Sequence, residues 1–156
     1  MSSNETEARF QYAKTLSIQA GLIALQYFRN LKAKDIRSKG SAYNLVTIAD
    51  CKVEQYLIEA IKKKFNADEF LAEESSVDQP QSPYSLKQPN LKLWVIDPID
   101  GTMNYARGLP FFCISIAFLT EEGVQFGIIY DPITQELFTA KKNHGAYCNQ
   151  KKIKVS

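Results

Sequence analysis

Residues 94–107 read Trp-Val-Ile-Asp-Pro-Ile-Asp-Gly-Thr-Met-Asn-Tyr-Ala-Arg, and this stretch governs how the rest of the chain is interpreted. The apolar run at 93–96 predicts a short buried strand. We expect the strand to end at Asp97, because a proline, a second aspartate and a glycine follow and favour a turn. Residues 102–107 then predict a short helix, which Gly108 would stop.

Carboxylates at a strand end, followed by a Gly-Thr pair at a helix start, can hold a cation and a phosphate together. Asp97 and Asp100 carry hard oxygen ligands, and the Ile99 carbonyl lies between them in the sequence. The N–H groups of Gly101 and Thr102 would point out of a helix N-terminus, where an anion is favoured. An ordinary hairpin turn uses the same residue types, so this pattern alone leaves both interpretations open.

Composition indicates a globular protein of one domain. The chain has 156 residues, 45% of them hydrophobic and 23% charged. A net charge of +2 argues against direct nucleic-acid or membrane-surface binding. The polar N-terminus is unlike a signal peptide and no apolar run would span a membrane, so we expect a cytoplasmic location. Cys51, Cys113 and Cys148 are predicted to be reduced, mostly buried thiols.

Two long helices are expected in the first half. Residues 5–30 carry an apolar stripe at three- and four-residue steps: Phe10, Ala13, Leu16, Ala20, Ile23, Ala24, Tyr27 and Phe28. A second helix is predicted over 47–65, after a polar loop or exposed hairpin at 32–44. A brief strand at 70–72 should follow, and then a long surface loop at 75–91.

In the second half the apolar period changes to two. Strands are predicted at 111–118, 124–130, 136–140 and 152–155, with turns between them. His144, in one of these turns, is expected to be a surface or loop-stabilising residue and not a catalytic one. Turn signals at this spacing favour an antiparallel meander, so the fold class is predicted as α+β, with two long helices packed on a largely antiparallel sheet.

Acid residues recur where these elements begin or end. Asp50 lies in the first turn of the second helix, where it could simply cap it, and Glu73 follows the strand at 70–72. If they meet Asp97 and Asp100, the all-oxygen set favours Mg²⁺ over zinc. Thr102 beside Asp50 could orient and deprotonate a water. The sequence therefore favours metal-assisted hydrolysis of a phosphate monoester.

The motif at 97–102, preceded by Trp94 and followed by Asn104, resembles the signature of the inositol monophosphatase family. Segments 44–50, 73–75 and 145–149 resemble further family segments, in the family order. The resemblance implies a Mg²⁺-dependent, lithium-sensitive phosphatase, commonly a homodimer, in a layered αβαβα sandwich of which this chain would be the N-terminal part.

The resemblance also implies a role for each matching residue. The metal ligands would be Glu73, Asp97, the Ile99 carbonyl and Asp100; the catalytic residues Thr102, Asp50 and Glu73; and the substrate-binding residues Asp100, Gly101, Thr102 and Lys39. Ala72 and Tyr105 replace the usual Gly and Phe, and we expect both to be tolerated.

The family's Trp-Asp-x-Ala-Ala-Gly segment, which completes its second metal site, has no match here. We therefore expect residues 1–156 to be a single domain, the N-terminal metal- and phosphate-binding half, without the family's C-terminal domain. Inositol 1-phosphate is the favoured substrate. Three alternative functions stay open: a nucleotide 3′-phosphatase, a fructose bisphosphatase, and a catalytically incomplete module that binds metal, phosphate or a partner. Exposed apolar surface should make the chain self-associate.

Overall fold

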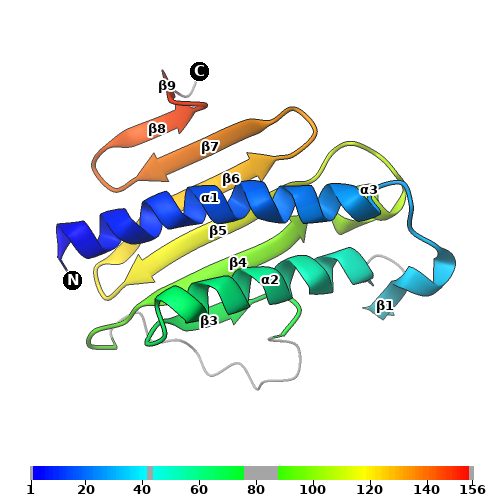
Figure 1. The fold of residues 1–156 in the computed structure, drawn as a ribbon, viewed down its shortest axis with the longest axis horizontal. Coiled ribbons are helices and arrows are strands. Elements are labelled where there is room, and N and C mark those ends of the chain that lie inside the picture. The colour runs from blue at the N-terminus through cyan, green and yellow to red at the C-terminus, as the bar shows by residue number, and fades with distance from the viewer. Residues whose placement is uncertain (1, 42–43, 76–87, 155–156) are drawn as a thin grey trace.

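The computed structural model describes residues 2–41, 44–75 and 88–154. Helices α1 (Ser3–Tyr27) and α2 (Ile48–Lys64) lie side by side on one face of a seven-stranded sheet (Figure 1). The sheet order is β3-β4-β5-β6-β7-β8-β9, and all neighbours are antiparallel except β3 and β4. The predicted α+β class, with two long helices on a largely antiparallel sheet, is confirmed.

The remaining elements are short. The strands of the sheet are β3 (Glu69–Ala72), β4 (Leu93–Asp100), β5 (Cys113–Thr120), β6 (Gly123–Asp131), β7 (Glu136–Lys141), β8 (Gly145–Cys148) and β9 (Lys151–Ile153). A 3-10 turn, η1 (Ala33–Asp35), leads into the hairpin of β1 (Ile36–Ser41) and β2 (Asn44–Thr47), which confirms the hairpin alternative for residues 32–44. The helix α3 (Thr102–Ala106) follows β4 directly.

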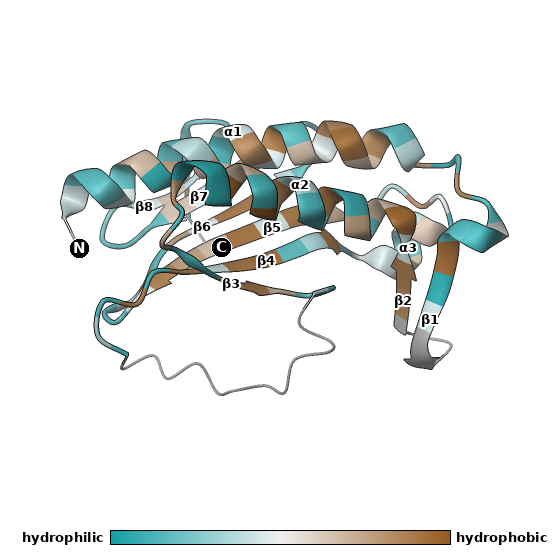
Figure 2. Cartoon of the chain, turned by 60° about the horizontal axis from the view of Figure 1, so that its bottom comes forward, coloured by the Kyte–Doolittle hydropathy of each residue, from teal (hydrophilic) through white to brown (hydrophobic). Residues whose placement is uncertain are grey.

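Helix α1 buries the predicted apolar stripe against the sheet. Ala13, Leu16, Ala20 and Ala24 are at most 2% exposed. Gly21 lies so close to the sheet that an added Cβ would be 2.6 Å from a ring carbon of Tyr130. Figure 2 shows the long apolar segments of the strands beneath the two helices. The helix therefore packs closely because small residues face the sheet.

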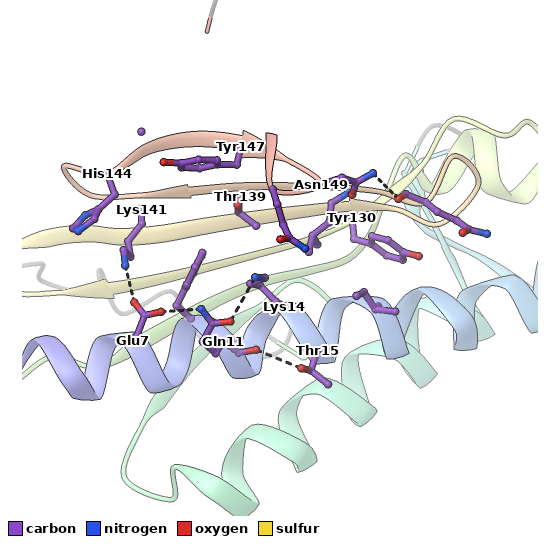
Figure 3. Close-up of a pocket in the computed structure, with 16 residues that line it drawn as sticks. Glu7, Gln11, Lys14, Thr15, Tyr130, Thr139, Lys141, His144, Tyr147 and Asn149 are labelled. Atoms are coloured by element: carbon purple, nitrogen blue, oxygen red, sulfur yellow. Dashed lines mark hydrogen bonds and ion pairs between the residues drawn. The ribbon is translucent and has the colours of Figure 1, made fainter. Parts of the chain in front are cut away.

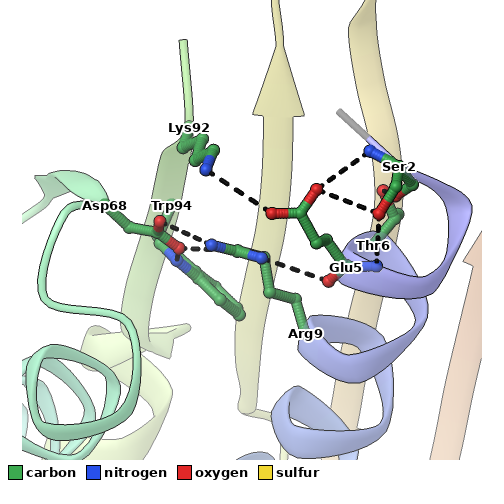
Figure 4. Close-up of polar contacts among 7 residues, drawn as sticks. All are labelled: Ser2, Glu5, Thr6, Arg9, Asp68, Lys92 and Trp94. Atoms are coloured by element: carbon green, nitrogen blue, oxygen red, sulfur yellow. Dashed lines mark hydrogen bonds and ion pairs between the residues drawn. The ribbon is translucent and has the colours of Figure 1, made fainter. Parts of the chain in front are cut away.

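A buried charged network ties the N-terminal part of α1 to the sheet (Figure 4). Arg9 donates from Nε and Nη2 to the two carboxylate oxygens of Asp68, both at 2.7 Å, and Trp94 Nε1 donates to Asp68 at 2.9 Å. The Arg9 guanidinium also lies 4.4 Å from the centre of the Phe65 ring. The network joins α1, the turn before β3, and β4, so it holds the sheet end opposite the acidic motif.

The central strand is longer than the sequence predicts. β4 does not end at Asp97 but continues to Asp100, and its pairing with β5 shifts register between these two residues. Pro98 has no N–H to donate, which explains why pairing is interrupted without the strand ending. The two aspartates are therefore carried by one irregular strand end.

A second correction concerns residues 145–148, which lie outside every strand that the sequence predicts. Residues 145–148 form β8, which pairs with β7 and β9. The strand is only four residues long, and turn residues at positive φ, Asn143 and Asn149, lie on either side of it. These turn residues explain why the sequence pattern did not predict a strand here. Of the last predicted strand, Lys151–Ile153 forms β9 and Val155 lies outside the described residues. Residues 76–87 of the predicted loop also lie outside them.

The prediction of mostly buried thiols was wrong for Cys51. All three cysteines are free, but Cys51 is exposed and Cys113 and Cys148 are half-buried. Cys51 follows Asp50 by one residue on α2, so it turns away from the face that Asp50 buries. Of the helices in the described ranges, none combines the length and hydropathy that a membrane crossing needs.

Candidate active site

The start of α2 places Asp50 in the protein interior. Thr47 caps the helix: its hydroxyl accepts from the amides of Ala49 and Asp50, and Asp50 Oδ2 accepts in return from the Thr47 amide at 2.9 Å and from its hydroxyl. Asp50 is fully buried, and burial raises its pKa while the hydrogen bonds from Thr47 oppose that shift. The capping role is confirmed, and it leaves Oδ1 for another partner.

That partner comes from α3. The Thr102 hydroxyl oxygen lies 3.1 Å from Asp50 Oδ1 and 3.0 Å from the Ile99 carbonyl oxygen, so its single proton can be donated to either. Three predicted site residues from α2, β4 and α3 therefore meet through one hydroxyl group.

Asp97 occupies the centre of the acid-rich strand ends. Its Oδ1 is buried and has no hydrogen-bond partner among the described residues. Burial raises the pKa of Asp97 to about 7, and the charges of Glu73 and Asp100, together with a hydrogen bond to Glu73, add to the shift. The parallel register pairs Ala72 with Ile96, so Glu73 follows β3 beside Asp97. The structure thus brings Glu73, Asp97 and Asp100 together.

Asp100 and Gly101 form the turn into α3. Asp100 is exposed, and its Oδ2 lies 3.8 Å from the Cys113 sulfur on β5. Burial, and then the nearby charges of Asp100 and Asp97, raise the pKa of Cys113 to about 12, so this thiol stays protonated. Gly101 has a φ of 96°, and an added Cβ would lie 2.7 Å from the Phe111 carbonyl oxygen. Only glycine fits this turn without strain.

The remaining predicted site residue, Lys39, lies on β1, and its side chain is outside the described part of the structure. The β1–β2 hairpin is nevertheless close to the acid cluster, since β2 contacts both α2 and α3. Tyr105, the predicted tolerated departure, donates its hydroxyl to the Ala24 carbonyl at 2.6 Å and is fully buried. The hydroxyl oxygen that Tyr has and Phe lacks is therefore hydrogen-bonded, although it is buried.

Sequence reasoning missed Glu54. This side chain is 4% exposed on α2, and its carboxylate accepts from the backbone amides of Glu74 at 2.7 Å and Ser75 at 2.8 Å. The available signal was the spacing Asp50-x-x-x-Glu54, which places two acids on one face of a helix whose other residues there are apolar.

The residue types of the cluster fit a hard cation. Asp97 offers an unpaired buried oxygen, and Glu73, Asp100 and the Ile99 carbonyl add further oxygen donors. However, within residues 2–41, 44–75 and 88–154 no three His, Cys, Asp or Glu side chains are arranged so that they could hold a metal ion. The unpaired Asp97 oxygen still favours a cation at this place, because leaving a buried carboxylate oxygen without a partner is costly.

A hollow of about 920 Å³ lies elsewhere, between α1 and the strands β6 to β8 (Figure 3). Lys141 bridges across it to Glu7 at 2.6 Å, and Lys14 and Tyr147 also line it. His144, in the turn at its rim, is exposed and lies 2.6 Å from the Lys142 carbonyl oxygen, which supports the predicted turn-stabilising role. None of the predicted site residues lines this hollow. Although it is large, it is therefore not the candidate active site.

Solved structures of known proteins share this fold. An inositol monophosphatase (IMPase) from Thermotoga maritima aligns with a TM-score of 0.82 and 28% identity, over 96% of this chain and 54% of that one. An IMPase/NADP phosphatase complexed with Mg²⁺ and phosphate aligns with a TM-score of 0.79 and 25% identity, over 96% of this chain and 54% of that chain. The class is therefore that of the N-terminal half of such phosphatases.

Sequence relationships identify the family. The profile of the inositol monophosphatase family matches residues 5–156. Inositol monophosphatase 1 of Sus scrofa is 39% identical over 145 residues, which are 93% of this chain and 50% of that protein. The chain belongs to the inositol monophosphatase family, a family of metal-dependent phosphomonoesterases. It spans about half the length of the curated relatives it matches.

Proposed function

We propose that this chain supplies the metal- and phosphate-binding part of a Mg²⁺-dependent phosphomonoesterase, with inositol 1-phosphate as the favoured substrate. The observation that carries the proposal is the Thr102 hydroxyl, which joins the buried Asp50 carboxylate to the Ile99 carbonyl beside Asp97. This arrangement puts a proton relay next to a set of oxygen ligands.

Each residue has a part in the proposed mechanism. Glu73, Asp97, Asp100 and the Ile99 carbonyl would hold Mg²⁺, which when bound supplies positive charge to the phosphate and lowers the pKa of a water. Thr102 Oγ1 orients the attacking water by accepting its proton, while the proton of Thr102 passes to Asp50 Oδ1. Because burial raises the pKa of Asp50, this carboxylate accepts a proton more readily than an exposed one. The water oxygen bonds to phosphorus as the bond between phosphorus and the substrate alcohol oxygen breaks, and the departing alkoxide takes a proton from solvent water.

The substrate contacts are proposed from the family resemblance. Amides of Gly101 and Thr102 would face the phosphate, Asp100 would contact the substrate, and Lys39 would approach from the hairpin. Inhibition by lithium, a homodimeric assembly and a cytoplasmic location are proposals on the same basis. The name of the related IMPase/NADP phosphatase supports a nucleotide phosphate as an alternative substrate. A fructose bisphosphate is a second alternative, which the resemblance alone leaves open.

A second candidate function is a binding module without turnover. It is supported by the unpaired, buried Asp97 Oδ1 beside the charges of Glu73 and Asp100, and it needs no proton transfer through Thr102. Such a module would bind Mg²⁺ and phosphate through the same cluster but hydrolyse nothing.

Phosphate release from inositol 1-phosphate, followed across a range of Mg²⁺ concentrations, tests the proposal. We expect Thr102→Val to lower turnover by about 10²- to 10⁴-fold, the usual contribution of acid–base catalysis, and Asp97→Asn to abolish it. Thr134→Val is the matched control, because Thr134 is an exposed residue of the β6–β7 turn.

The outcomes separate the two candidates. Turnover that Thr102→Val leaves unchanged would contradict the relay. The binding module would be supported by two results together: the chain shows no turnover, and Mg²⁺ raises the melting temperature of the native chain but not that of Asp97→Asn. A melting temperature unaffected by Mg²⁺ would contradict both candidates.

A further inference from the structure

The buried face of α2 carries two acidic side chains one turn apart. Asp50 reaches Thr102, as described above, and Glu54 points to the segment that follows β3. Glu54 is 4% exposed and both of its oxygens accept a backbone amide: Oε2 from Glu74 at 2.7 Å, and Oε1 from Ser75 at 2.8 Å. A buried carboxylate with both oxygens engaged in this way holds backbone and is not placed to be a metal ligand.

These contacts complete the restraint of the chain around Glu73. The amide of Glu73 itself donates to the Ile96 carbonyl at 3.2 Å, one residue before Asp97. The next two amides donate to Glu54. Three consecutive N–H groups are thus fixed, the first by β4 and the others by α2, where the β3 pairing has ended. The Glu73 side chain leaves the backbone at the point where these two restraints meet.

The restraint opposes a specific electrostatic force. Ala72 pairs with Ile96 in the parallel register of β3 and β4, so the like-charged residues Glu73 and Asp97 follow side by side. Repulsion would drive an unrestrained segment after β3 away from β4. Glu54 adds a third negative charge nearby, but its two amide donors compensate that charge locally.

We propose that Glu54 is a positioning residue, which holds the backbone at 73–75 so that the Glu73 carboxylate stays beside Asp97 for cation binding. The inference rests on the proposed function, because it assigns Glu54 to the same metal site. It adds a role for a residue outside the motif at 97–102. Helix α2 then serves both parts of the site, because Asp50 contacts Thr102 and Glu54 holds the backbone next to Glu73.

Two simpler roles would give different results. Glu54 could strengthen cation binding only through its negative charge, or it could stabilise the fold without affecting the site. Glu54→Asp keeps the charge, but its side chain is one methylene shorter and cannot hold both amides as Glu54 does. Glu54→Gln keeps the length but presents an NH₂ group to an N–H donor. Glu59→Gln, at an exposed position of α2, is the matched control for loss of charge.

The experiment measures binding of Mn²⁺, as a substitute for Mg²⁺, to the whole chain by electron paramagnetic resonance. Amide hydrogen exchange of Glu74 and Ser75 is measured by NMR on metal-free samples of the same proteins. We expect Glu54→Asp and Glu54→Gln each to weaken Mn²⁺ binding by about 10-fold, the lower range for residues that orient metal ligands. Both variants should also exchange the two amides faster than the native chain, and Glu59→Gln should change neither quantity.

Other results would overturn the inference. If Glu54→Asp binds Mn²⁺ as tightly as the native chain while Glu54→Gln does not, Glu54 acts through its charge alone. If both variants bind like the native chain, or if neither folds, Glu54 is a residue of the core. Asp97→Asn shows whether the proposed function itself fails. If this variant binds Mn²⁺ as tightly as the native chain, or if the native chain binds no Mn²⁺, the proposed metal site is absent. The inference about Glu54 then fails with it.

Discussion

At the residue scale, Asp97 combines three properties that seldom coexist in a purely structural side chain. It is half-buried, it lies beside two other carboxylates, and one of its oxygens has no partner among the described residues. Burial and like charge both disfavour the ionised form, which is why the pKa is raised to about 7. A cation would reverse both effects, so the stability of this residue's environment should depend on pH and on metal.

The sign of the pH dependence follows from the direction of the shift. The folded chain binds a proton at Asp97 more readily than the unfolded chain, whose carboxyl has the ordinary value of 3.8. Without metal, the free energy of unfolding should therefore fall as the pH rises from about 4 to about 7. Asp97→Asn removes this loss. We expect it to raise stability by about 2 kcal/mol at pH 8, roughly 6 °C in melting temperature, and by nothing below pH 4.

Thermal denaturation in EDTA at a series of pH values measures this difference. Glu121→Gln, at an exposed turn position, serves as the control and should show no such dependence. In saturating Mg²⁺ the order should reverse, because the native chain gains stability from binding and the variant does not. A variant no more stable than the native chain at pH 8 would show that the Asp97 carboxylate is not destabilised.

At the element scale, the turn from β4 into α3 determines where the site residues meet. Gly101 adopts a left-handed conformation there, and its Cα faces the Phe111 carbonyl oxygen. A side chain would both strain the backbone and displace the loop before β5. The turn is what brings Thr102 back to the Ile99 carbonyl and to Asp50.

We therefore expect Gly101→Ala to destabilise the fold by about 2 kcal/mol or more, because a forced left-handed backbone and a close contact add. Gly127→Ala is the control. Gly127 lies on β6 and has open space around the position of a Cβ, so its substitution should change stability by less than about 0.5 kcal/mol. Chemical denaturation measures both. Equal effects of the two substitutions would contradict the role assigned to the turn.

The second element-scale feature is the Arg9–Asp68–Trp94 network at the other end of the sheet (Figure 4). Arg9→Met leaves the buried Asp68 carboxylate with too few donors, and should cost about 3–5 kcal/mol. The double variant Arg9→Met/Asp68→Asn removes the unpaired charge while Trp94 keeps an acceptor, so it should be more stable than Arg9→Met alone. Urea denaturation of the four chains gives the coupling energy. A double variant as unstable as the sum of the single changes would contradict the pairing.

At the scale of the whole molecule, the two long helices cover only one face of the sheet (Figure 1). On the opposite face, Ala117, Gly127, Ala140 and Ala146 lie in register across four strands. They border a shallow apolar hollow of about 250 Å³, and Ile129 beside it is 46% exposed. A floor of small residues with apolar neighbours is typical of a surface that packs against something else.

We expect this face to cause concentration-dependent self-association, as the sequence analysis predicts. Light scattering after size exclusion should give a mass above 17.7 kDa that rises with concentration. Ile129→Lys should shift the distribution towards monomer, whereas Leu22→Lys, at a position 51% exposed on α1, should not. A monodisperse monomer of the native chain would contradict the prediction.

Apolar periodicity and capping residues are enough to predict the local elements of this fold. The stripe of α1, the capped start of α2 and the short helix from Thr102 are local patterns, and each of them folds as its residues predict. The prediction was least accurate where turn residues lie inside strands. There, long-range pairing overrode the local signals and extended β4 to Asp100 and formed β8.

The partners of the acidic side chains, in contrast, depend on contacts between elements that are distant in the sequence. Asp50 looks like a helix cap in the sequence, and it is one, but the position of α3 near the start of α2 also gives it a hydrogen bond from Thr102. The spacing of Asp50 and Glu54 indicates an acid on the buried face of α2, but it does not show what Glu54 holds, because its partners are backbone amides 20 and 21 residues away. Contacts between backbone and a distant side chain leave no residue pattern at the partner position. For that reason, the sequence identified most of the acids of the site and only the fold showed how they are held.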